Sequence, residues 1–524
     1  MTTAADERPA VRAPVFGREL MVVTGHQAAT MAAVAAHKRG GSVIDAAIAA
    51  SAALATVAAQ ATSIGGDCFW LHHDAATGRT HALNASGVAP AAATPARFAD
   101  GMHVRGPLAA VVPGLVRAWD EMHRRFGRLG WSTLFDDAIG IADGHPVSYV
   151  LATRIPEMTD TLAADPGCAA LYLPGGRAIG VGDTLHQPQL AATLRAIADK
   201  GADEFYSGAL AGRIAAGFER AGGLVTAADL AAYRPLWVEP MSTEYRGHRV
   251  SVMPPNSCGA LLLVQLNGLS ALSSTELLAD PARTVGWQMS AMKAAFRLGV
   301  PHIADPSAVP NAPADLLSPA MTRELQAAVR AQASAGSVPG SGGTACVLVT
   351  DAAGNMCCLV QSVYNVFGST FLDPGTGILY NNRMQDFAPV AGQPNSVGPG
   401  RRPFHTLCPI LVHRDGRPRF ALASPGGISQ TLTGVQVLSH LVDRGADVAW
   451  AVQAPRWCNR RGGDFLIEPS FPDAIAGAVQ AMGHQARRGG DSYFFGSAKA
   501  IEWLPSGNLA GAGDDRREAF VLGV

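Results

Sequence analysis

Residues 342–349 read Gly-Gly-Thr-Ala-Cys-Val-Leu-Val, so two glycines and a hydroxyl residue lead into a continuous apolar run. Such a run predicts a strand that is buried on both faces. Residues 352–355 (AAGN) predict a turn, because Gly and Asn tolerate the unusual backbone angles that turns require. The apolar residues 356–363 predict the return strand. Thr344 is therefore expected at the exposed start of a buried hairpin.

A chain break between Gly343 and Thr344 would place a hydroxyl nucleophile and a free α-amine on one residue. An α-amino group titrates near ~8 and a lysine near ~10.4, so this amine can act as the general base for its own hydroxyl. An N-terminal Thr is one of the recurring versions of the nucleophile-and-base arrangement. Taken alone, however, a Gly-Gly-Thr triplet before a strand is more often a simple loop.

Short motifs in a fixed order support the catalytic interpretation. They are residues 40–47 (GGSVIDAA), 63–69 (SIGGDCF), 203–208 (DEFYSG), 222–224 (GGL), 229–233 (DLAAY), 245–247 (YRG), 253–255 (MPP), 381–387 (NNRMQDF) and 424–427 (SPGG). As an ordered set they resemble the gamma-glutamyltransferase family of self-processing N-terminal-nucleophile hydrolases, from about Val22 to the C-terminus. The resemblance implies an α+β fold, a four-layer αββα sandwich formed by two autoproteolytic fragments, residues 19–343 and residues 344–524.

The same resemblance implies the catalytic residues. Thr344 matches the nucleophile, with the cleavage site between Gly343 and Thr344. Ser362 matches a hydroxyl that assists processing. Gly426 and Gly427 match the backbone N–H donors of the oxyanion hole, where glycine lets the backbone approach the substrate closely.

The substrate-binding positions depart from the family pattern. Ser86 stands where the family has an Arg that pairs with the substrate α-carboxylate, and a hydroxyl does not replace a bidentate Arg–carboxylate pair. His405 and Thr406 stand where the family has paired serines. Asp386 still matches the carboxylate that binds the substrate amine.

Tyr364 replaces an Asn that helps to hold that amine, with Asn365 beside it. Three of the four glutamyl-binding elements are therefore altered, and glutathione or another γ-glutamyl donor is not expected to be the main substrate.

The altered positions resemble a sub-branch of the family that includes oxamate amidohydrolase and related acylases. Arg383, three residues before Asp386, is expected to reach a small substrate carboxylate, and Arg401 and Arg402 are further candidates. An Arg near a site is, however, more often ion-paired than ligand-binding. The expected reaction is hydrolysis, through an acyl-enzyme, of a small carboxylate-bearing amide or α-oxo-acyl (oxamate- or oxalyl-like) substrate.

Three alternatives stay open. One is a biosynthetic relative that cleaves an oxalyl unit through a C–C bond with the same nucleophile. Another is a true gamma-glutamyltransferase or glutathione hydrolase. The third is an uncleaved, inactive scaffold, which would persist as a single chain.

Length, net charge and cysteine content exclude several classes of function for this chain. The chain has 524 residues, a formal net charge of −1 and no basic block, which argues against nucleic-acid binding. Its eight cysteines include no CxxC pair, and no Cys/His/Asp cluster has metal-ligand spacing, so we expect neither metal nor cofactor. The N-terminus lacks an apolar signal core, and no segment suggests a membrane span, so a cytoplasmic location is expected. The expected partners are a small-molecule substrate and the chain's own second fragment, and a dimer of such heterodimers stays open as an alternative.

Periodicity predicts the remaining organisation. Residues 1–18 are expected to form a loose tail, 107–240 to be mostly helical and 305–343 to be flexible. The other expected elements are a strand at 20–23, one long alanine-rich helix, two short strands around 74–78, strands at 345–351, 356–363, 377–381, 408–413 and 418–423, and helices at 428–444 and 472–482.

Overall fold

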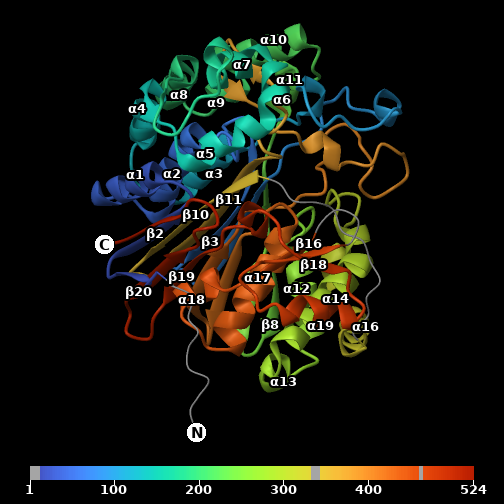
Figure 1. The fold of residues 1–524 in the computed structure, drawn as a ribbon. Coiled ribbons are helices and arrows are strands. Elements are labelled where there is room, and N and C mark those ends of the chain that lie inside the picture. The colour runs from blue at the N-terminus through green and yellow to red at the C-terminus, as the bar shows by residue number, and fades with distance from the viewer. Residues whose placement is uncertain (1–11, 332–342, 460–463) are drawn as a thin grey trace.

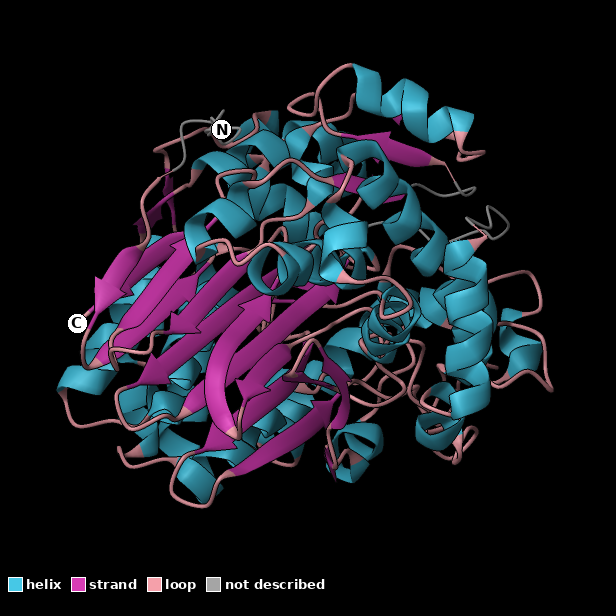
Figure 2. Cartoon of the chain, turned by 90° about the horizontal axis from the view of Figure 1, so that it is seen from below, coloured by secondary structure: helices cyan, strands magenta, loops and turns pink. Residues whose placement is uncertain are grey.

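The computed structural model describes residues 12–331, 343–459 and 464–524. Two antiparallel seven-stranded sheets lie between two layers of helices, the first layer formed before residue 240 and the second mostly after residue 259 (Figure 1). Seen from below, the strands form one block bordered by helices (Figure 2). The predicted α+β four-layer sandwich is confirmed.

The first sheet contains the hairpin that begins at Thr344. Its strands, in spatial order, are β21 (Phe520–Gly523), β2 (Leu20–Thr24), β10 (Gly343–Asp351), β11 (Met356–Tyr364), β3 (Asp67–Asp74), β4 (Arg79–Ala85) and β7 (Leu236–Val238). The second sheet has the order β1 (Val15–Gly17), β20 (Leu509–Gly513), β19 (Lys499–Trp503), β15 (Arg417–Ala423), β14 (Ile410–Arg414), β9 (His248–Val252) and β8 (Met241–Tyr245).

Alternation along each strand distributes the apolar side chains between two cores. On β10, Cys346 and Leu348 pack between the two sheets, whereas Val347 and Val349 pack under the first helical layer. Because side chains of a strand alternate between faces, a strand with a core on each side must be apolar throughout. This explains the unbroken apolar run after Thr344.

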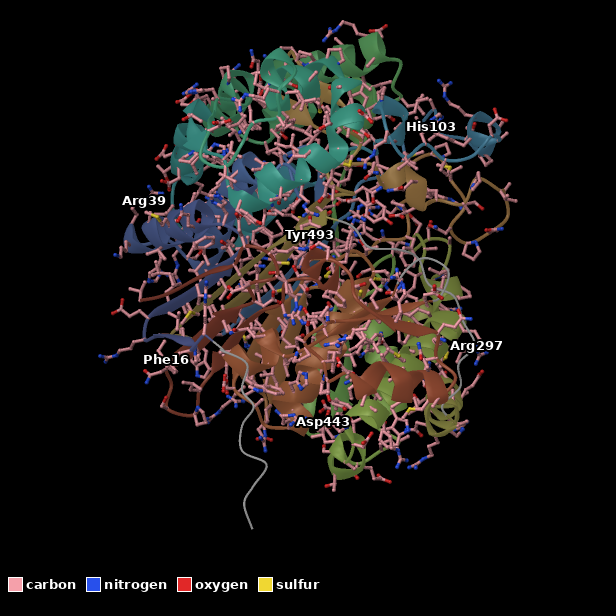
Figure 3. The ribbon with its side chains drawn as sticks, viewed as in Figure 1. Phe16, Arg39, His103, Arg297, Asp443 and Tyr493 are labelled. Carbon is pink, nitrogen blue, oxygen red and sulfur yellow. The ribbon has the colours of Figure 1, made fainter. Side chains whose placement is uncertain are left out.

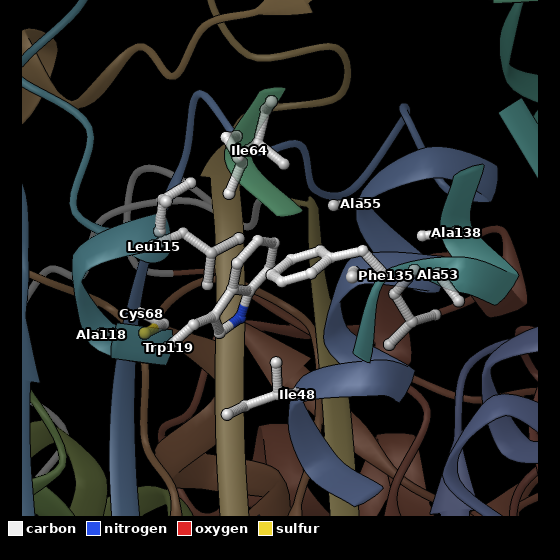
Figure 4. Close-up of a cluster of buried hydrophobic side chains, with 14 of the residues drawn as sticks. Ile48, Ala53, Ala55, Ile64, Cys68, Leu115, Ala118, Trp119, Phe135 and Ala138 are labelled. Atoms are coloured by element: carbon white, nitrogen blue, oxygen red, sulfur yellow. The ribbon is translucent and has the colours of Figure 1, made fainter. Parts of the chain in front are cut away.

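The first helical layer packs on the outer face of the β10 sheet. Trp119 and Phe135 meet Ile48 and Ile64 in this core (Figure 4). The helices of the region are α1 (Gln27–Lys38), α2 (Val43–Val57), α3 (Leu115–Phe126), α4 (Asp136–Asp143), α5 (Tyr149–Arg154), α6 (Thr159–Ala163), α7 (Pro166–Tyr172), α8 (Pro188–Lys200), α9 (Asp203–Tyr206), α10 (Ala209–Ala221) and α11 (Ala227–Ala232).

The second helical layer covers the outer face of the other sheet. Val252, Ile410 and Leu422 of that sheet pack in one core with Leu262 and Met292 of the helices. These helices are α12 (Ala260–Leu269), α13 (Ser274–Leu278), α14 (Pro281–Gly299), α15 (Ala312–Leu316), α16 (Pro319–Arg330), α17 (Ser429–Leu438), α18 (Val448–Gln453) and α19 (Ala474–Ala481).

Helix α2 is buried along its whole length, and its start is fixed by polar groups. Ser42 and Asp45 form a capping box, in which each side chain accepts a hydrogen bond from the other residue's backbone N–H. Asp45 Oδ2 also accepts from the backbone N–H of Arg128 at 2.8 Å. One buried carboxylate therefore caps α2 and ties it to the segment that follows α3.

Most expected elements are present, and four differ. The single alanine-rich helix is two helices, because Gly40 adopts a positive φ of 92° and α2 starts afresh at its own cap. Val15–Gly17, expected in a loose tail, pair with β20. The strand expected at 377–381 is only Ile378–Leu379.

The stretch 305–343, expected to be flexible, contains α15 and α16, while its residues 332–342 lie outside the described part. Among the described residues, no helix is both long enough and apolar enough to cross a membrane.

The cap of α2 gives a stability prediction. Asp45→Ala is expected to lower the free energy of unfolding by about 2 kcal/mol, because it removes a helix cap and leaves buried backbone donors unbonded. Urea unfolding followed by circular dichroism measures the change. Asp100→Ala, at an exposed aspartate, is the control, and equal unfolding midpoints for the two variants would contradict the role given to Asp45.

Candidate active site

Thr344 lies at the start of the central strand β10 and is 5% exposed. Its Oγ1 donates to the Gly343 carbonyl oxygen at 2.6 Å and accepts from Gln430 Nε2 at 3.3 Å. Gly343 runs so close to the Gln60 carbonyl oxygen that an added Cβ would lie 2.8 Å from it. The hydroxyl is thus held against the carbonyl group immediately before it, at a position that favours glycine.

Ser362 binds the same carbonyl group from β11. Its Oγ donates to the Gly343 oxygen at 2.7 Å and accepts from the backbone N–H of Tyr364 at 2.7 Å. The amide of Tyr364 occupies the acceptor side of this hydroxyl, so the hydroxyl proton points at the Gly343 oxygen. Two hydroxyl groups therefore polarise a single peptide carbonyl, as expected for a group that becomes an oxyanion.

Gly426 and Gly427 lie on the loop between β15 and α17, with φ of 135° and 58°. Pro425 just before them lines the same cavity as Thr344, and Gln430 just after them contacts Thr344. Within the described chain, neither glycine N–H donates a hydrogen bond, although both carbonyl oxygens accept from α17. The two amides are thus unused donors in a segment whose neighbouring residues, Pro425 and Gln430, reach Thr344.

Most of the predicted substrate-binding residues gather with Asp67 in a buried group, which we call the arginine cluster: Asp67, Tyr364, Arg383, Asp386, His405 and Thr406.

Arg383 is the centre of the arginine cluster and is fully buried. Its Nε lies 3.3 Å from Asp67 Oδ2, its Nη1 donates to Thr406 Oγ1 at 3.1 Å, and its guanidinium lies 4.4 Å from the centre of the Tyr364 ring. Its Nη2 has no hydrogen-bond partner among the described residues. Arg383 is therefore ion-paired, as arginines near a site often are, yet it keeps one buried nitrogen free for a ligand.

Two carboxylates flank Arg383 and titrate differently. Burial alone would raise the pKa of Asp67, but Arg383, His405 and the N–H of Gly87 outweigh burial and lower it. Asp386, 3.6 Å from Arg383 Nη1, has a pKa raised to about 7, because burial outweighs Arg383 and the hydrogen bond from Tyr364. Near neutral pH the cluster therefore holds one firmly ionised carboxylate and one that is close to half protonated.

His405 is neutral and serves as a support. Burial and the nearby Arg383 lower its pKa to about 4, Nε2 donates to Asp67 Oδ2 at 2.7 Å, and Nδ1 accepts from Leu407 N–H. Both ring nitrogens are thus occupied within the protein, and the substrate-binding role of His405 stays a prediction.

The remaining predicted residues lie around this cluster. Asn365 Nδ2 donates to Gln385 Oε1 at 3.3 Å. Ser86 is buried, and its Oγ accepts from Asn256, whose backbone carbonyl accepts from the N–H of His405. Arg401 and Arg402 donate instead to the carbonyl oxygens of Ser396 and Arg234, outside the arginine cluster.

Sequence reasoning missed two residues of the site. Asp67 lay within a quoted glycine-rich motif, but only the pairing of Ser362 with Asp67 across β11 and β3 brings its carboxylate into the cluster. Gln430 follows the glycine pair by three residues, and its amide reaches Thr344 only because α17 begins there. No sequence signal marks either role.

Comparison with known proteins agrees with this geometry. The family model described as Gamma-glutamyltranspeptidase matches residues 29–524. The acylase ACY 1 proenzyme of Pseudomonas sp. strain SE83 is 33% identical over 532 residues, which cover 98% of this chain and 94% of the relative. The oxamate amidohydrolase proenzyme of Klebsiella pneumoniae subsp. pneumoniae is 34% identical over 521 residues, covering 96% and 98%.

A solved structure matches equally well. The crystal structure of cephalosporin acylase from Bacillus halodurans has a TM-score of 0.93 at 33% identity, covering 100% of this chain and 99% of that one. The chain therefore belongs to the gamma-glutamyltranspeptidase family and is an amidohydrolase of the N-terminal-nucleophile class.

Proposed function

We propose that the protein cleaves itself between Gly343 and Thr344 and then hydrolyses a small amide whose acyl group bears a carboxylate, such as oxamate. One observation carries the first half of the proposal. Thr344 Oγ1 and Ser362 Oγ both bind the Gly343 carbonyl oxygen, at 2.6 and 2.7 Å. A hydroxyl nucleophile and a hydroxyl donor are thus already assembled on one peptide bond.

Maturation requires only these groups and water. Thr344 Oγ1 attacks the Gly343 carbonyl carbon, and Ser362 stabilises the oxyanion of the tetrahedral intermediate. The hydroxyl proton passes to the Thr344 nitrogen, which is no longer an amide in this intermediate, and the C–N bond breaks to leave an ester and a free amine. Water then hydrolyses the ester, which frees the carboxylate of Gly343 and the α-amine of Thr344. Before this step the Thr344 nitrogen is an amide and has no basic lone pair, so the uncleaved chain is expected to be inactive.

Turnover repeats the same chemistry on a substrate amide. The α-amine of Thr344 accepts the hydroxyl proton as Oγ1 attacks, and the N–H groups of Gly426 and Gly427 bind the oxyanion. The leaving amine departs with that proton, and water hydrolyses the acyl-enzyme. The two fragments are expected to stay together as one fold.

The arginine cluster supports a carboxylate on the acyl group. Arg383 offers a buried, unbonded Nη2, and a protonated Asp386 can donate a hydrogen bond to an anion. A γ-glutamyl donor would instead place its ammonium group against Asp386, which near pH 7 is only partly ionised. Ser86, which lacks the charge to bind an α-carboxylate, also disfavours that donor.

The state of the cysteines supports a proposal about the cellular compartment of the protein. Seven buried cysteines of the described chain form no disulfide: Cys68, Cys168, Cys258, Cys346, Cys357, Cys358 and Cys408. Buried thiols that form no disulfide are typical of reducing compartments, which supports the proposal of a cytoplasmic location.

Self-cleavage gives the first prediction here. Wild-type protein is expected to yield two chains in a denatured mass measurement, the second beginning at Thr344, whereas Thr344→Ala stays as one 54.2 kDa chain. Ser362→Ala should slow cleavage roughly 100-fold, because it removes one oxyanion donor. Thr350→Ala is the matched control, since Thr350 is another buried threonine of β10. An uncleaved wild-type chain, or a cleaved Thr344→Ala chain, would contradict the proposal.

Carboxylate recognition by Arg383 gives a second prediction. In processed Arg383→Gln enzyme, KM for oxamate should rise about tenfold or more, because a charge-assisted hydrogen bond is lost, while KM for the neutral analogue oxamide changes little. Arg401→Gln serves as the control, being outside the arginine cluster. Equal effects on the two substrates would mean that Arg383 is only structural. A γ-glutamyl anilide turned over better than oxamate would favour the glutamyl alternative.

The titration of Asp386 gives a third prediction. Below pH 7 the protonated side chain adds no charge, and above pH 7 it becomes an anion 3.6 Å from Arg383, where it competes with and repels a substrate carboxylate. KM for oxamate should therefore rise with pH through about 7. Asp386→Asn should abolish this rise in a KM–pH profile from pH 5.5 to 8.5. A profile that is flat in the wild type, or unchanged in the variant, would disprove the assignment.

A further inference from the structure

A second group of cations lies beside Thr344, away from the arginine cluster. A small cavity of about 30 Å³ is lined by Thr344, Cys346 and Pro425, and also by Lys499 and Arg517. It adjoins a larger cavity of about 600 Å³ through shared residues, Val150, Arg517 and Glu518. Charged side chains thus line both cavities, and the proposed nucleophile lines the smaller one.

Lys499 is oriented toward this cavity by the pleat of β19. Ile501, two residues on, packs between the sheets, so Lys499 projects from the same face toward β10. The side chain is 2% exposed, and its Nζ donates to the carbonyl oxygen and the Oγ of Ser497. An ammonium group carries three protons, so these two acceptors leave one for a ligand.

Arg517 supplies the second cation. It is 7% exposed, its guanidinium lies 3.7 Å from the centre of the Tyr493 ring, and Nε and Nη2 both donate to the Tyr493 carbonyl oxygen. Tyr493 lies near the middle of the molecule in the view of Figure 3. Arg517 Nη1 is buried without a hydrogen-bond partner among the described residues.

Neither of these two cations has a carboxylate in direct contact. In the described part of the chain, no carboxylate oxygen lies within 4 Å of Lys499 Nζ or of the Arg517 guanidinium. Glu518 also lines the cavity, but its Oε1 accepts from the N–H of Val150. Buried Asp514 interacts with Lys499 from a greater distance, but it is already paired with Arg456 and Arg516. Burying two cations without a carboxylate in contact is costly unless an anion completes the site.

The sheet places the two charged groups on opposite sides of Thr344. In the strand order β21-β2-β10-β11-β3, the arginine cluster draws Tyr364 from β11 and Asp67 from β3. The small cavity is lined by Gly25, just after β2, and by Glu518, just before β21. If the acyl group of a substrate lies on the β11 side of Thr344, its leaving amine lies on the β2 side.

We infer that Lys499 and Arg517 form an anion-binding subsite for a carboxylate carried by the leaving amine, so that the preferred substrates are N-acylated amino acids or related amines with a carboxylate. This inference rests on the proposed function, because the direction of the amide is set by the arginine cluster. The bond chemistry is unchanged, since the subsite binds only the departing group.

Matched substrates test the subsite. N-oxalylglycine and N-ethyloxamate share an acyl group, and their leaving amines differ only by a carboxylate in place of a methyl group. Succinylglycine and N-ethylsuccinamate repeat the comparison with a longer acyl group. In wild-type enzyme, kcat/KM should be about tenfold or more higher for the glycine amides, as expected for a site built to bind a charged group. In Lys499→Met that ratio should fall toward one.

Controls separate charge from folding. Lys499→Arg keeps the positive charge and should retain most of the ratio. Lys293→Met removes another buried lysine, on α14 in the second helical layer, and should leave the ratio unchanged. Mass measurement confirms that each variant is cleaved before its kinetics are compared. Equal kcat/KM values for each matched pair in the wild type, or the same ratio in Lys499→Met, would overturn the inference.

A binding measurement decides the subsite even if none of these amides is hydrolysed. Wild-type crystals soaked in sodium bromide should show an anomalous peak between Lys499 Nζ and Arg517 Nη1, and Lys499→Met crystals should not. A bromide peak without turnover of any amide would retain the anion site and reject the proposed acyl substrates. Absence of bromide in the wild type would overturn the anion site itself.

Discussion

The cluster beside the nucleophile depends on a single buried carboxylate, that of Asp67. It pairs with the charge of Arg383 and accepts hydrogen bonds from His405 and from the N–H of Gly87. Removing one partner of such a buried pair typically costs about 3–5 kcal/mol, because the other charge is left unpaired. Asp67 therefore fixes the position of Arg383 against the ring of Tyr364. It also fixes the position of His405 against Phe69, and the rings of His405 and Phe69 meet edge to face. The Asp67 carboxylate therefore sets the positions of the side chains that can take part in a reaction on this side of Thr344.

A central strand is a suitable place for a nucleophile that must be rigid. β10 pairs with β2 on one side and β11 on the other, and it has an apolar core on each face. Pairing and packing therefore restrict the backbone of β10 along its length except at its first residues, where the register shifts between Gly343 and Ala345. Thr344 lies at that irregularity, so a well-packed strand holds it in place while its hydroxyl stays outside the regular ladder.

Much of this arrangement could be predicted from the sequence, for definite reasons. The hairpin at 345–363 and the strands around the turn at 74–78 are strongly patterned, and both are confirmed. The division of one alanine-rich segment into two helices was missed, although Gly40 and the Ser42–Asp45 cap mark it.

Within the site, the residues of the arginine cluster were named from motif positions, but their contacts were not. Asp67 enters through strand pairing, Gln430 through the start of a helix, and Lys499 through the pleat of a distant strand. Such neighbours are set by register and packing between segments that are far apart in the sequence, which periodicity does not encode. Sequence motifs thus identify residues whose chemical type matches a known role. Residues that reach the site only through strand pairing or packing are identified only from the three-dimensional structure.

The two-sided pairing of β10 has a consequence for the molecule after a break at its first residue. The fragment that begins with Thr344 supplies β21, β10 and β11 to one sheet, where β2 of the first fragment lies between β21 and β10. It supplies β14, β15, β19 and β20 to the other sheet, where they form a block between β1 and β9 of the first fragment. Neither fragment holds a complete sheet or a complete core. Once both have been unfolded, recovery becomes a bimolecular reaction that depends on concentration, whereas the uncut chain refolds alone. Before the break, the peptide bond keeps the two segments in one molecule, so their association during folding does not depend on protein concentration.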